Sequence, residues 1–186
     1  MKGRALFLVP LFLLCAVLLA QADLPGFSRI QLREGGTGRK ILSSVLRDGE
    51  QVVMTWKNSL FGLRVTEVFE MRRGMLILTT VTFADPQGPA PPLVKPSDVD
   101  DLYHTGGSFT ACGLNKPFDR IVHRVGELGE PGMSVGGREV AFKEEVGFGG
   151  SVVLTAARAR AYEILLERGN PQGVRMEGKD SPLRTP

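Results

Sequence analysis

Residues 52–83 read VVMTWKNSLFGLRVTEVFEMRRGMLILTTVTF, the longest run of β-branched, aromatic and apolar residues outside the N-terminus. Two turn signals, Leu60–Leu63 and Arg72–Gly74, divide this stretch into three pieces. In the first two pieces, apolar and polar residues alternate with the two-residue period of a strand. The third piece, Met75–Phe83, is apolar almost throughout, which is typical of a central strand covered on both faces. The stretch therefore predicts a three-stranded antiparallel meander.

Short strands separated by turns are expected on both sides of this meander. Residues 29–33, 41–47 and 119–125 alternate in the same way, and five prolines within residues 85–96 predict an exposed loop. The pattern predicts an all-β fold, an antiparallel β-sandwich or partly open barrel of about seven to nine short strands. Ala156–Arg168 has the composition of a helix but could also prolong the strand before it. One C-terminal helix at most is therefore expected.

The N-terminus has the pattern of a secretory signal peptide. A basic start, Met1–Arg4, precedes the uncharged apolar run Ala5–Leu19, and Ala20–Ala22 offers small residues for cleavage. The apolar run is shorter than the roughly 20 residues of a membrane-spanning helix. We therefore expect bacterial export to the periplasm or beyond, with a mature chain that begins at Asp23. The chain would touch a membrane only through the uncleaved signal peptide, with a retained anchor as the alternative.

The predicted organisation is a signal peptide over residues 1–22, a single β-rich domain over 23–168 and a flexible C-terminal tail over 169–186. The whole chain has 23 basic and 20 acidic residues, and the signal peptide accounts for part of this small excess. No basic stripe is present, so nucleic-acid binding is not expected. Only Cys112 remains after cleavage, so an internal disulfide is impossible and an apolar core must stabilise the fold.

Glu67 is the most unusual residue of the meander, because its strand should face a core and a buried ionised carboxylate needs a partner. If Trp56 pairs with Val65, then Trp56, Asn58 and Glu67 share one face, and Trp56 is expected to be buried in the main core. Asn58 and Ser59 could then donate hydrogen bonds to Glu67 or to a ligand. The alternative is a Glu67 that is exposed or satisfied by backbone amides. The candidate ligand- or partner-binding residues are Trp56, Asn58, Ser59 and Glu67.

Two further groups of residues could carry chemistry. Cys112 and His123 could form a thiolate pair, but Cys112 lies in no nucleophile motif, so an idle or buried thiol is the default. An acidic turn offers oxygen and nitrogen ligands but lacks the glycine and the final glutamate of a calcium-binding loop. The members of this turn are Asp98, Asp100, Asp101 and His104. The sequence thus predicts a solvated turn, no metal site and no cofactor.

The meander resembles a small family of secreted bacterial proteins, the domain-of-unknown-function family 1850, whose genes typically lie beside those of TAXI-type TRAP solute transporters. That family has an aromatic strand ending in His-Ser, then a strand that carries glutamate, then a glycine-rich hairpin. Ser59 and Glu67 match this pattern, whereas Asn58 stands where the family has histidine. The resemblance covers residues 51–155. It implies a periplasmic accessory role near an uptake system and no known reaction.

Three functions remain open at this point. The first is a non-enzymatic secreted module associated with TRAP-type uptake, which binds a small solute or a transporter component. The second is a hydrolase-like enzyme that uses Glu67, or Cys112 with His123. The third is a structural domain that binds another protein. Asn58 cannot shuttle protons near neutral pH, and no paired-carboxylate motif is present, so the first hypothesis is favoured over the second.

Overall fold

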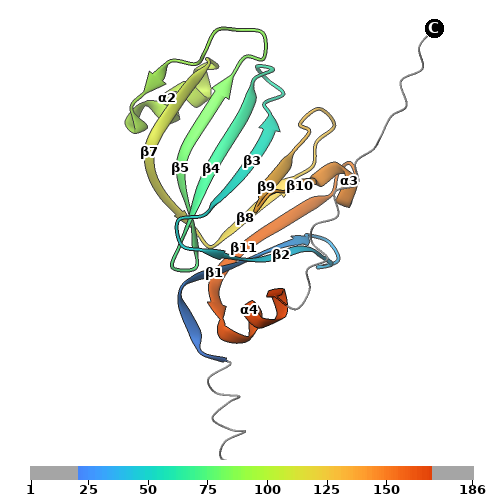
Figure 1. Cartoon of the computed structure of the whole chain (residues 1–186). Coiled ribbons are helices and arrows are strands. Elements are labelled where there is room, and N and C mark those ends of the chain that lie inside the picture. Colours follow the sequence, from blue (N-terminus) through green and yellow to red (C-terminus); the bar gives the residue numbers. More distant parts are fainter. Residues whose placement is uncertain (1–20, 169–186) are drawn as a thin grey trace, which may run out of the picture.

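A computed structural model describes residues 21–168, which form two packed β-sheets (Figure 1). The strands are β1 (Asp23–Glu34), β2 (Lys40–Arg47), β3 (Gln51–Lys57), β4 (Arg64–Arg72), β5 (Met75–Ala84), β6 (Leu93–Val94), β7 (Phe109–Phe118), β8 (Arg120–Arg124), β9 (Gly132–Val135), β10 (Arg138–Ala141) and β11 (Ser151–Arg160). The helices are the short 3-10 turn η1 (Pro96–Asp98), α2 (Val99–Thr105), α3 (Phe142–Val146) and α4 (Ala161–Arg168). The predicted all-β sandwich is confirmed. Within the described residues it has eleven strands, more than the predicted seven to nine.

The two sheets differ in size. The smaller has the order β2-β1-β11-β8, and the larger has the order β10-β9-β3-β4-β5-β7-β6. All pairings are antiparallel except that of β6 with β7. β7 and β8 are separated by one residue, Asp119, so the chain passes there directly from the larger sheet to the smaller.

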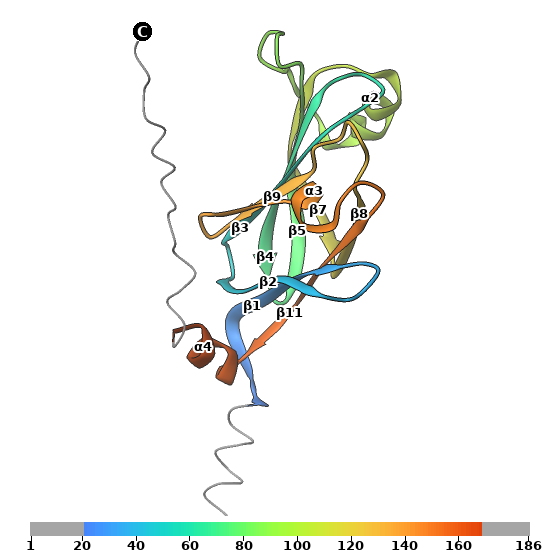
Figure 2. The ribbon, with the colours of Figure 1, turned by 90° about the vertical axis from the view of Figure 1, so that its right-hand side faces the viewer.

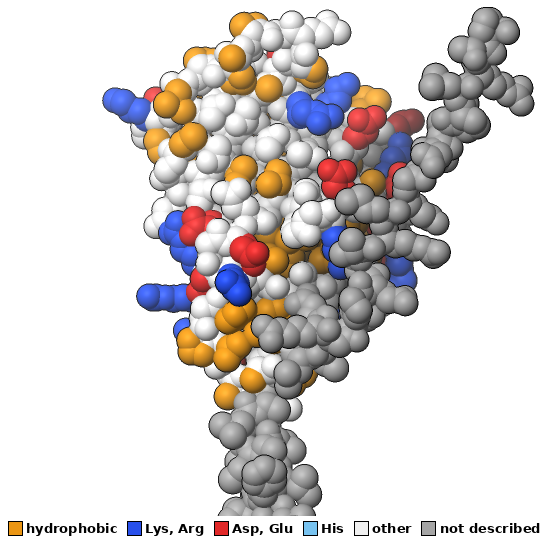
Figure 3. All heavy atoms as spheres, viewed as in Figure 1, with side chains coloured by type: hydrophobic (Ala, Val, Ile, Leu, Met, Phe, Trp, Pro, Cys, Tyr) orange, Lys and Arg blue, Asp and Glu red, His pale blue; other side chains and the backbone are white. Residues whose placement is uncertain are grey.

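The predicted meander is confirmed as β3, β4 and β5 in the larger sheet. Trp56 lies opposite Val65 and Met54 lies opposite Glu67, which is the register that puts these residues on one face. β5 differs from the prediction, because Thr80 and Thr82 on its outer face are only half-buried. No element within residues 21–168 forms a further layer on that face, and the part of it visible in Figure 3 is mostly uncharged polar side chains and backbone.

Two apolar clusters cover the inner face of the larger sheet. The larger cluster lies between the sheets, and its members include Ile30, Leu32, Phe69, Phe142 and Leu154. The smaller cluster packs against β6 and α2 and consists of Leu63, Val65, Val81, Phe83, Phe109 and Ala111. Figure 2 shows α2, β8 and β11 on the same side of the larger sheet. The four-stranded smaller sheet is too narrow to cover the whole seven-stranded sheet, so α2 covers the part of the inner face that the smaller sheet leaves free.

The tip of the β4–β5 hairpin connects the two sheets through hydrogen bonds. Its central residues, Arg73 (φ 50°) and Gly74 (φ 82°), both have the positive φ that a type I′ turn requires. The N–H of Gly74 donates to Oγ of the buried Ser28 on β1 (2.9 Å), and the N–H of Arg73 donates to Asp48 (3.1 Å). Ser28 Oγ donates in turn to Asp48 (2.8 Å). Asp48 therefore stabilises the crossing from β2 to β3, which joins the sheets.

The segment that could be strand or helix, Ala156–Arg168, contains both. β11 runs to Arg160, and α4 begins at Ala161. The N–H of Arg160 donates to Oε2 of Glu163 (2.8 Å), which is the cap that a glutamate at the third helical position provides. Glu163 also forms an ion pair with Arg29 on β1. These contacts stabilise the boundary between β11 and α4.

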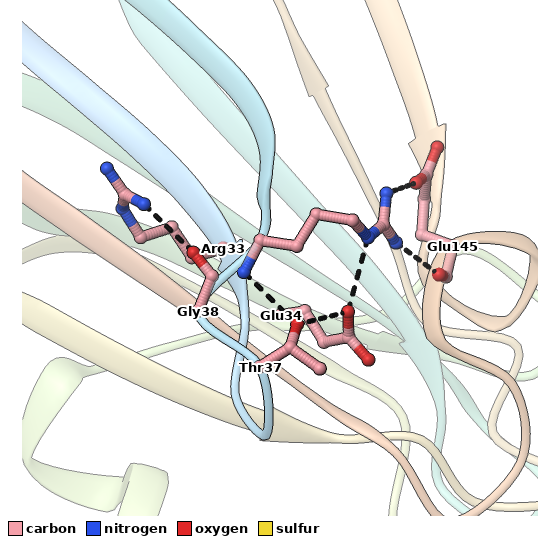
Figure 4. A network of polar contacts seen from close by, with 6 residues as sticks. Arg33, Glu34, Thr37, Gly38 and Glu145 are labelled. Carbon is pink, nitrogen blue, oxygen red and sulfur yellow. Dashed lines mark hydrogen bonds and ion pairs between the residues drawn. The ribbon is translucent and has the colours of Figure 1, made fainter.

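A polar network holds the β1–β2 turn against α3 (Figure 4). Arg39 donates to the backbone oxygen of Glu145 (2.7 Å) and to the carboxylate of Glu34 (3.2 Å). Thr37 Oγ1 donates to the same carboxylate (2.6 Å). Because these groups are exposed, solvent screens their charges. The network therefore shapes the turn rather than adding much to stability.

Two predicted segments lie outside the described residues: all but the last two residues of the signal peptide, and the C-terminal tail over 169–186. The predicted division of the chain therefore stays a prediction. β1 begins at Asp23, the residue at which the mature chain is predicted to start. Among the helices that the structure describes, none has the length and apolar character needed to cross a membrane.

Candidate functional site

A cavity of about 640 Å³ lies on the inner side of the larger sheet, between α2 and the free edge of β8. Four segments line it: Trp56–Phe61 at the end of β3, Tyr103–His104 on α2, Val122–Arg124 on β8, and the loop Gly126–Pro131 except for residue 130. Its volume suits a small ligand or a few side chains of a peptide.

Exposed large hydrophobic side chains gather at this cavity. The described residues include seven such side chains, and five of them line it: Leu60, Phe61, Tyr103, Val122 and Leu128. The other two, Leu93 and Phe148, lie elsewhere. Single exposed apolar side chains are ordinary, but several of them around one cavity, here called the apolar rim, are typical of a binding surface.

The chain's single tryptophan and both of its histidines also line the cavity. The ring of Trp56 lies 6.2 Å from that of His123 and 6.2 Å from that of Phe83. Phe83 contacts Tyr103 at 5.7 Å, and His123 contacts Phe142 at 5.9 Å. Aromatic contacts therefore run without a break from α2 to α3 behind the cavity, and they give it a rigid wall.

Trp56 lies on the predicted face of β3, but its predicted burial in the main core is wrong. It is partly buried and packs against the smaller cluster. It stands near the end of β3, where the cavity replaces the cover that the smaller sheet provides elsewhere. The two-residue period gives the face of a side chain, but not what covers that face.

Asn58 builds the loop after β3 instead of binding Glu67. Its Oδ1 accepts hydrogen bonds from the N–H groups of Leu60 (3.0 Å) and Phe61 (3.3 Å), and the residue is only 7% exposed. This turn brings Leu60 and Phe61 into the rim. The ring of Phe61 lies over Gly106 at the end of α2, where a Cβ would stand 2.3 Å from it. With φ 73° this position favours glycine, and any other side chain there would displace the Phe61 ring.

The mouth of the cavity carries charged and polar groups. Lys57, Arg124 and Glu127 are exposed there, and Ser59 adds an exposed hydroxyl. Burial lowers the pKa of His123 below its ordinary value, which favours the neutral ring. A neutral imidazole offers one donor and one acceptor. The site can therefore hold an apolar group against its aromatic wall and a polar or anionic group near its mouth.

Glu67 lies behind Trp56 and is not among the residues that line the cavity. On β4 it stands between Val65 of the smaller cluster and Phe69 of the larger. Burial raises the pKa of Glu67, and a hydrogen bond from the Trp56 side chain lowers it in part. The indole of Trp56 is therefore the partner of this carboxylate, rather than the polar side chains at the end of β3.

The structure separates Cys112 from His123. Cys112 is exposed on the outer face of β7, opposite Thr80. The ring of His123 lies on the inner side, against Trp56. The larger sheet thus stands between the two side chains, and they form no thiolate pair.

The acidic turn at residues 98–104 forms the end of η1 and most of α2. Across the range 21–168, no group of three or more His, Cys, Asp or Glu side chains is placed to hold a metal ion. The contribution of this turn to the cavity is Tyr103 and His104.

The sequence did not identify five of the lining residues, namely Leu60, Phe61, Tyr103, Val122 and Leu128, and it suggested His104 only as a metal ligand. They come from loops, a short helix and an end strand, far apart along the chain. The available signal was apolar residues inside turns, such as Leu60 and Phe61 beside Gly62, where a purely structural turn would be polar.

No protein-family model matches the chain, and neither a curated protein nor a solved structure shows significant similarity to it. The resemblance of residues 51–155 to the domain-of-unknown-function family 1850 stays a prediction.

Proposed function

We propose that the protein is a non-enzymatic binding module whose site is the cavity between α2 and β8. The observation that carries this proposal is the gathering of five of the seven exposed large hydrophobic side chains around one cavity. Leaving apolar surface in water costs about 25 cal/mol per Å². A ligand that covers the rim would recover this free energy, so the rim favours binding.

The lining indicates what kind of ligand fits. Trp56 and Tyr103 offer aromatic faces for an apolar group. At the mouth, the two cations Lys57 and Arg124 outnumber the carboxylate of Glu127, which favours a polar or negatively charged group. The ligand class is therefore amphipathic, with its apolar part inward.

Export and an association with TRAP-type solute uptake belong to the same proposal. Export is supported by the N-terminal pattern, and the association by the match of Ser59 and Glu67 to the resembled family. In that setting the cavity would hold a solute or a segment of a transporter component. N-terminal sequencing of the periplasmic protein should give Asp23; a chain that begins at Met1 in the membrane fraction would contradict export.

The geometry gives less support to the hydrolase-like alternative. Glu67 has the raised pKa that a general acid needs, but it stands behind Trp56 and away from the cavity lining. Cys112 and His123 lie on opposite sides of the larger sheet. Glu67 therefore lies away from the proposed binding site, and Cys112 and His123 do not come together.

Binding of the amphipathic dye anilinonaphthalene sulfonate tests the proposed site. Because Trp56 is the only tryptophan, energy transfer from it reports dye that is bound close to the cavity. Phe61→Ala and Leu128→Ala each remove part of the rim, so each should weaken dye binding by roughly fivefold or more.

The chain offers matched controls for both variants. Phe148 and Leu93 are exposed large hydrophobics outside the cavity, so Phe148→Ala and Leu93→Ala should leave dye binding unchanged. Equal effects of rim and control variants, or no energy transfer from Trp56, would contradict the proposed site.

A further inference from the structure

β8 is an end strand of the smaller sheet, and within residues 21–168 it pairs only with β11. Two hydrogen bonds that flank this pairing show which residues of β8 direct their backbone groups to β11. The N–H of Val125 donates to the carbonyl of Gly150 (2.9 Å), and the N–H of Ala156 donates to the carbonyl of Asp119 (2.8 Å). Successive residues of an antiparallel strand direct their backbone groups alternately to the partner and away from it. The residues of β8 whose N–H and C=O groups point to the free edge are therefore Arg120, Val122 and Arg124.

The cavity meets β8 at this edge. It touches three consecutive residues, Val122, His123 and Arg124. Consecutive side chains of a strand point to opposite faces, so a cavity that touches all three lies beside the edge of the strand. The free backbone groups of β8 therefore stand next to the apolar rim.

The side chains of β8 also differ between its two faces. Arg120, Val122 and Arg124 are exposed on the outer face. Ile121 and His123 are half-buried on the inner face, where Ile121 packs against the larger cluster. A strand added at this edge would place its outward side chains beside two arginines and its inward side chains at the cavity.

We propose that β8 and the cavity together bind an extended peptide segment of another protein, which adds a strand to the smaller sheet. The inference rests on the proposed binding function and names its partner. The segment alternates acidic residues, which pair with Arg120 and Arg124, with apolar residues, which enter the cavity. Main-chain hydrogen bonds supply affinity and the two faces supply specificity, as in other cases of strand addition.

A second copy of this chain fits the edge poorly. Antiparallel pairing of two β8 strands about Val122 would place Arg120 of one copy opposite Arg124 of the other. Like charges directly opposite each other are destabilising, and such charges are a usual protection of an edge against self-association. The same two arginines favour an acidic partner.

A short synthetic peptide tests the proposal. The palindrome Glu-Leu-Thr-Leu-Glu, blocked at both ends and fluorescently labelled, puts its glutamates beside the arginines when its threonine lies opposite Val122. In the antiparallel register the threonine N–H points to β8, whereas the N–H groups of both leucines point away. N-methylation of the threonine should therefore weaken binding, measured by fluorescence anisotropy, about tenfold or more. N-methylation of one leucine is the matched control and should change binding little.

Substitutions in β8 test the same interaction with the peptide left unchanged. Val122→Pro removes an N–H that points away from β11, so the ladder within the sheet is kept and proline is tolerated. It should weaken peptide binding about tenfold or more, whereas Val122→Ala keeps the N–H and should have a much smaller effect. Arg120→Glu with Arg124→Glu should reverse the preference, in favour of a peptide with lysines in place of the glutamates.

The outcomes separate this inference from the proposed function. Dye binding that responds to Phe61→Ala, together with no binding of the peptide by the wild-type protein, would leave the cavity as a small-molecule site and overturn the inference alone. Equal binding by the two N-methylated peptides would also overturn it, as would equal binding by Val122→Pro and Val122→Ala. If Val122→Pro does not fold, the two N-methylated peptides still decide the question on the wild-type protein.

Discussion

Trp56 is the diagonal neighbour of Glu67 across β3 and β4, and a hydrogen bond from its side chain lowers the pKa of the carboxyl that burial raises. Trp56 forms part of the cavity wall, whereas Glu67 stands behind that wall between the two apolar clusters. A buried carboxylate is costly, and one hydrogen bond only partly offsets the cost.

We expect Glu67→Gln to be tolerated better than Glu67→Ala. Glutamine keeps an acceptor for the indole and nearly the same volume, whereas alanine leaves the indole N–H without its partner. Glu67→Ala should therefore cost about 1–3 kcal/mol of unfolding free energy, and Glu67→Gln less. Thermal melts measure both, and tryptophan emission should shift only in Glu67→Ala. Wild-type melting and emission in both variants would mean that the hydrogen bond does not matter.

The raised pKa of Glu67 makes a pH-dependent contribution to stability. Because burial holds the pKa in the folded state above the ordinary 4.5, the folded protein binds this proton more tightly than the unfolded chain. Stability from this group therefore falls as the pH rises from 4.5 through the folded-state pKa. Glu67→Gln lacks this contribution, so its stability relative to wild type should increase as the pH rises from 4.5 through the folded-state pKa of Glu67. Parallel denaturation curves for the two proteins across this range would contradict the assignment.

His123 should have the opposite pH dependence. Burial lowers its pKa below the ordinary 6.5, so the unfolded chain binds the proton more tightly. The contribution of His123 is complete above pH 6.5 and is lost as the pH falls through the folded-state pKa. His123→Phe keeps a ring against Trp56 and does not titrate, so it should lose less stability on acidification than wild type. Equal losses of stability on acidification in His123→Phe and in the wild type would contradict this assignment.

The sequence predicted the meander because three consecutive strands impose their own local period. The two-residue alternation placed Trp56, Val65 and Glu67 on one face, and the register confirms this. The late helix was harder to predict, since Ala156–Arg160 pairs with β1 before Glu163 caps the helix. A contact with a strand more than a hundred residues away decided that boundary, and local propensity does not contain it.

The cavity could not be predicted, because it depends on what the smaller sheet fails to cover. Asp48–Gly49 has the composition of a hairpin turn, yet it crosses from one sheet to the other, since Asp48 binds Ser28 and Arg73. That crossing sets which part of the larger sheet remains open. Trp56 is consequently a wall residue rather than a core residue, although its position in the strand pattern is that of a core residue.

Gly74 should tolerate substitution much less well than Gly49. Both have positive φ, 82° and 97°, so alanine is strained at either position. A Cβ at Gly74 would also lie 2.5 Å from the backbone nitrogen of Arg158, whereas a Cβ at Gly49 meets nothing within 4 Å. Gly74→Ala should therefore cost about 1–3 kcal/mol more than Gly49→Ala in urea denaturation. Equal costs would show that the hairpin tip does not press on the smaller sheet.

Asn58→Ala should weaken both the fold and the cavity. The substitution removes the acceptor for the N–H groups of Leu60 and Phe61, so the loop that carries them into the rim loses its turn. We expect a loss of about 1–2 kcal/mol in unfolding free energy and weaker dye binding. Asn58→Asp keeps the acceptor and should retain most of both properties. Ser59→Ala, at the exposed neighbour, should keep the wild-type unfolding free energy; a loss equal to that of Asn58→Ala would show that the turn does not depend on the Asn58 acceptor.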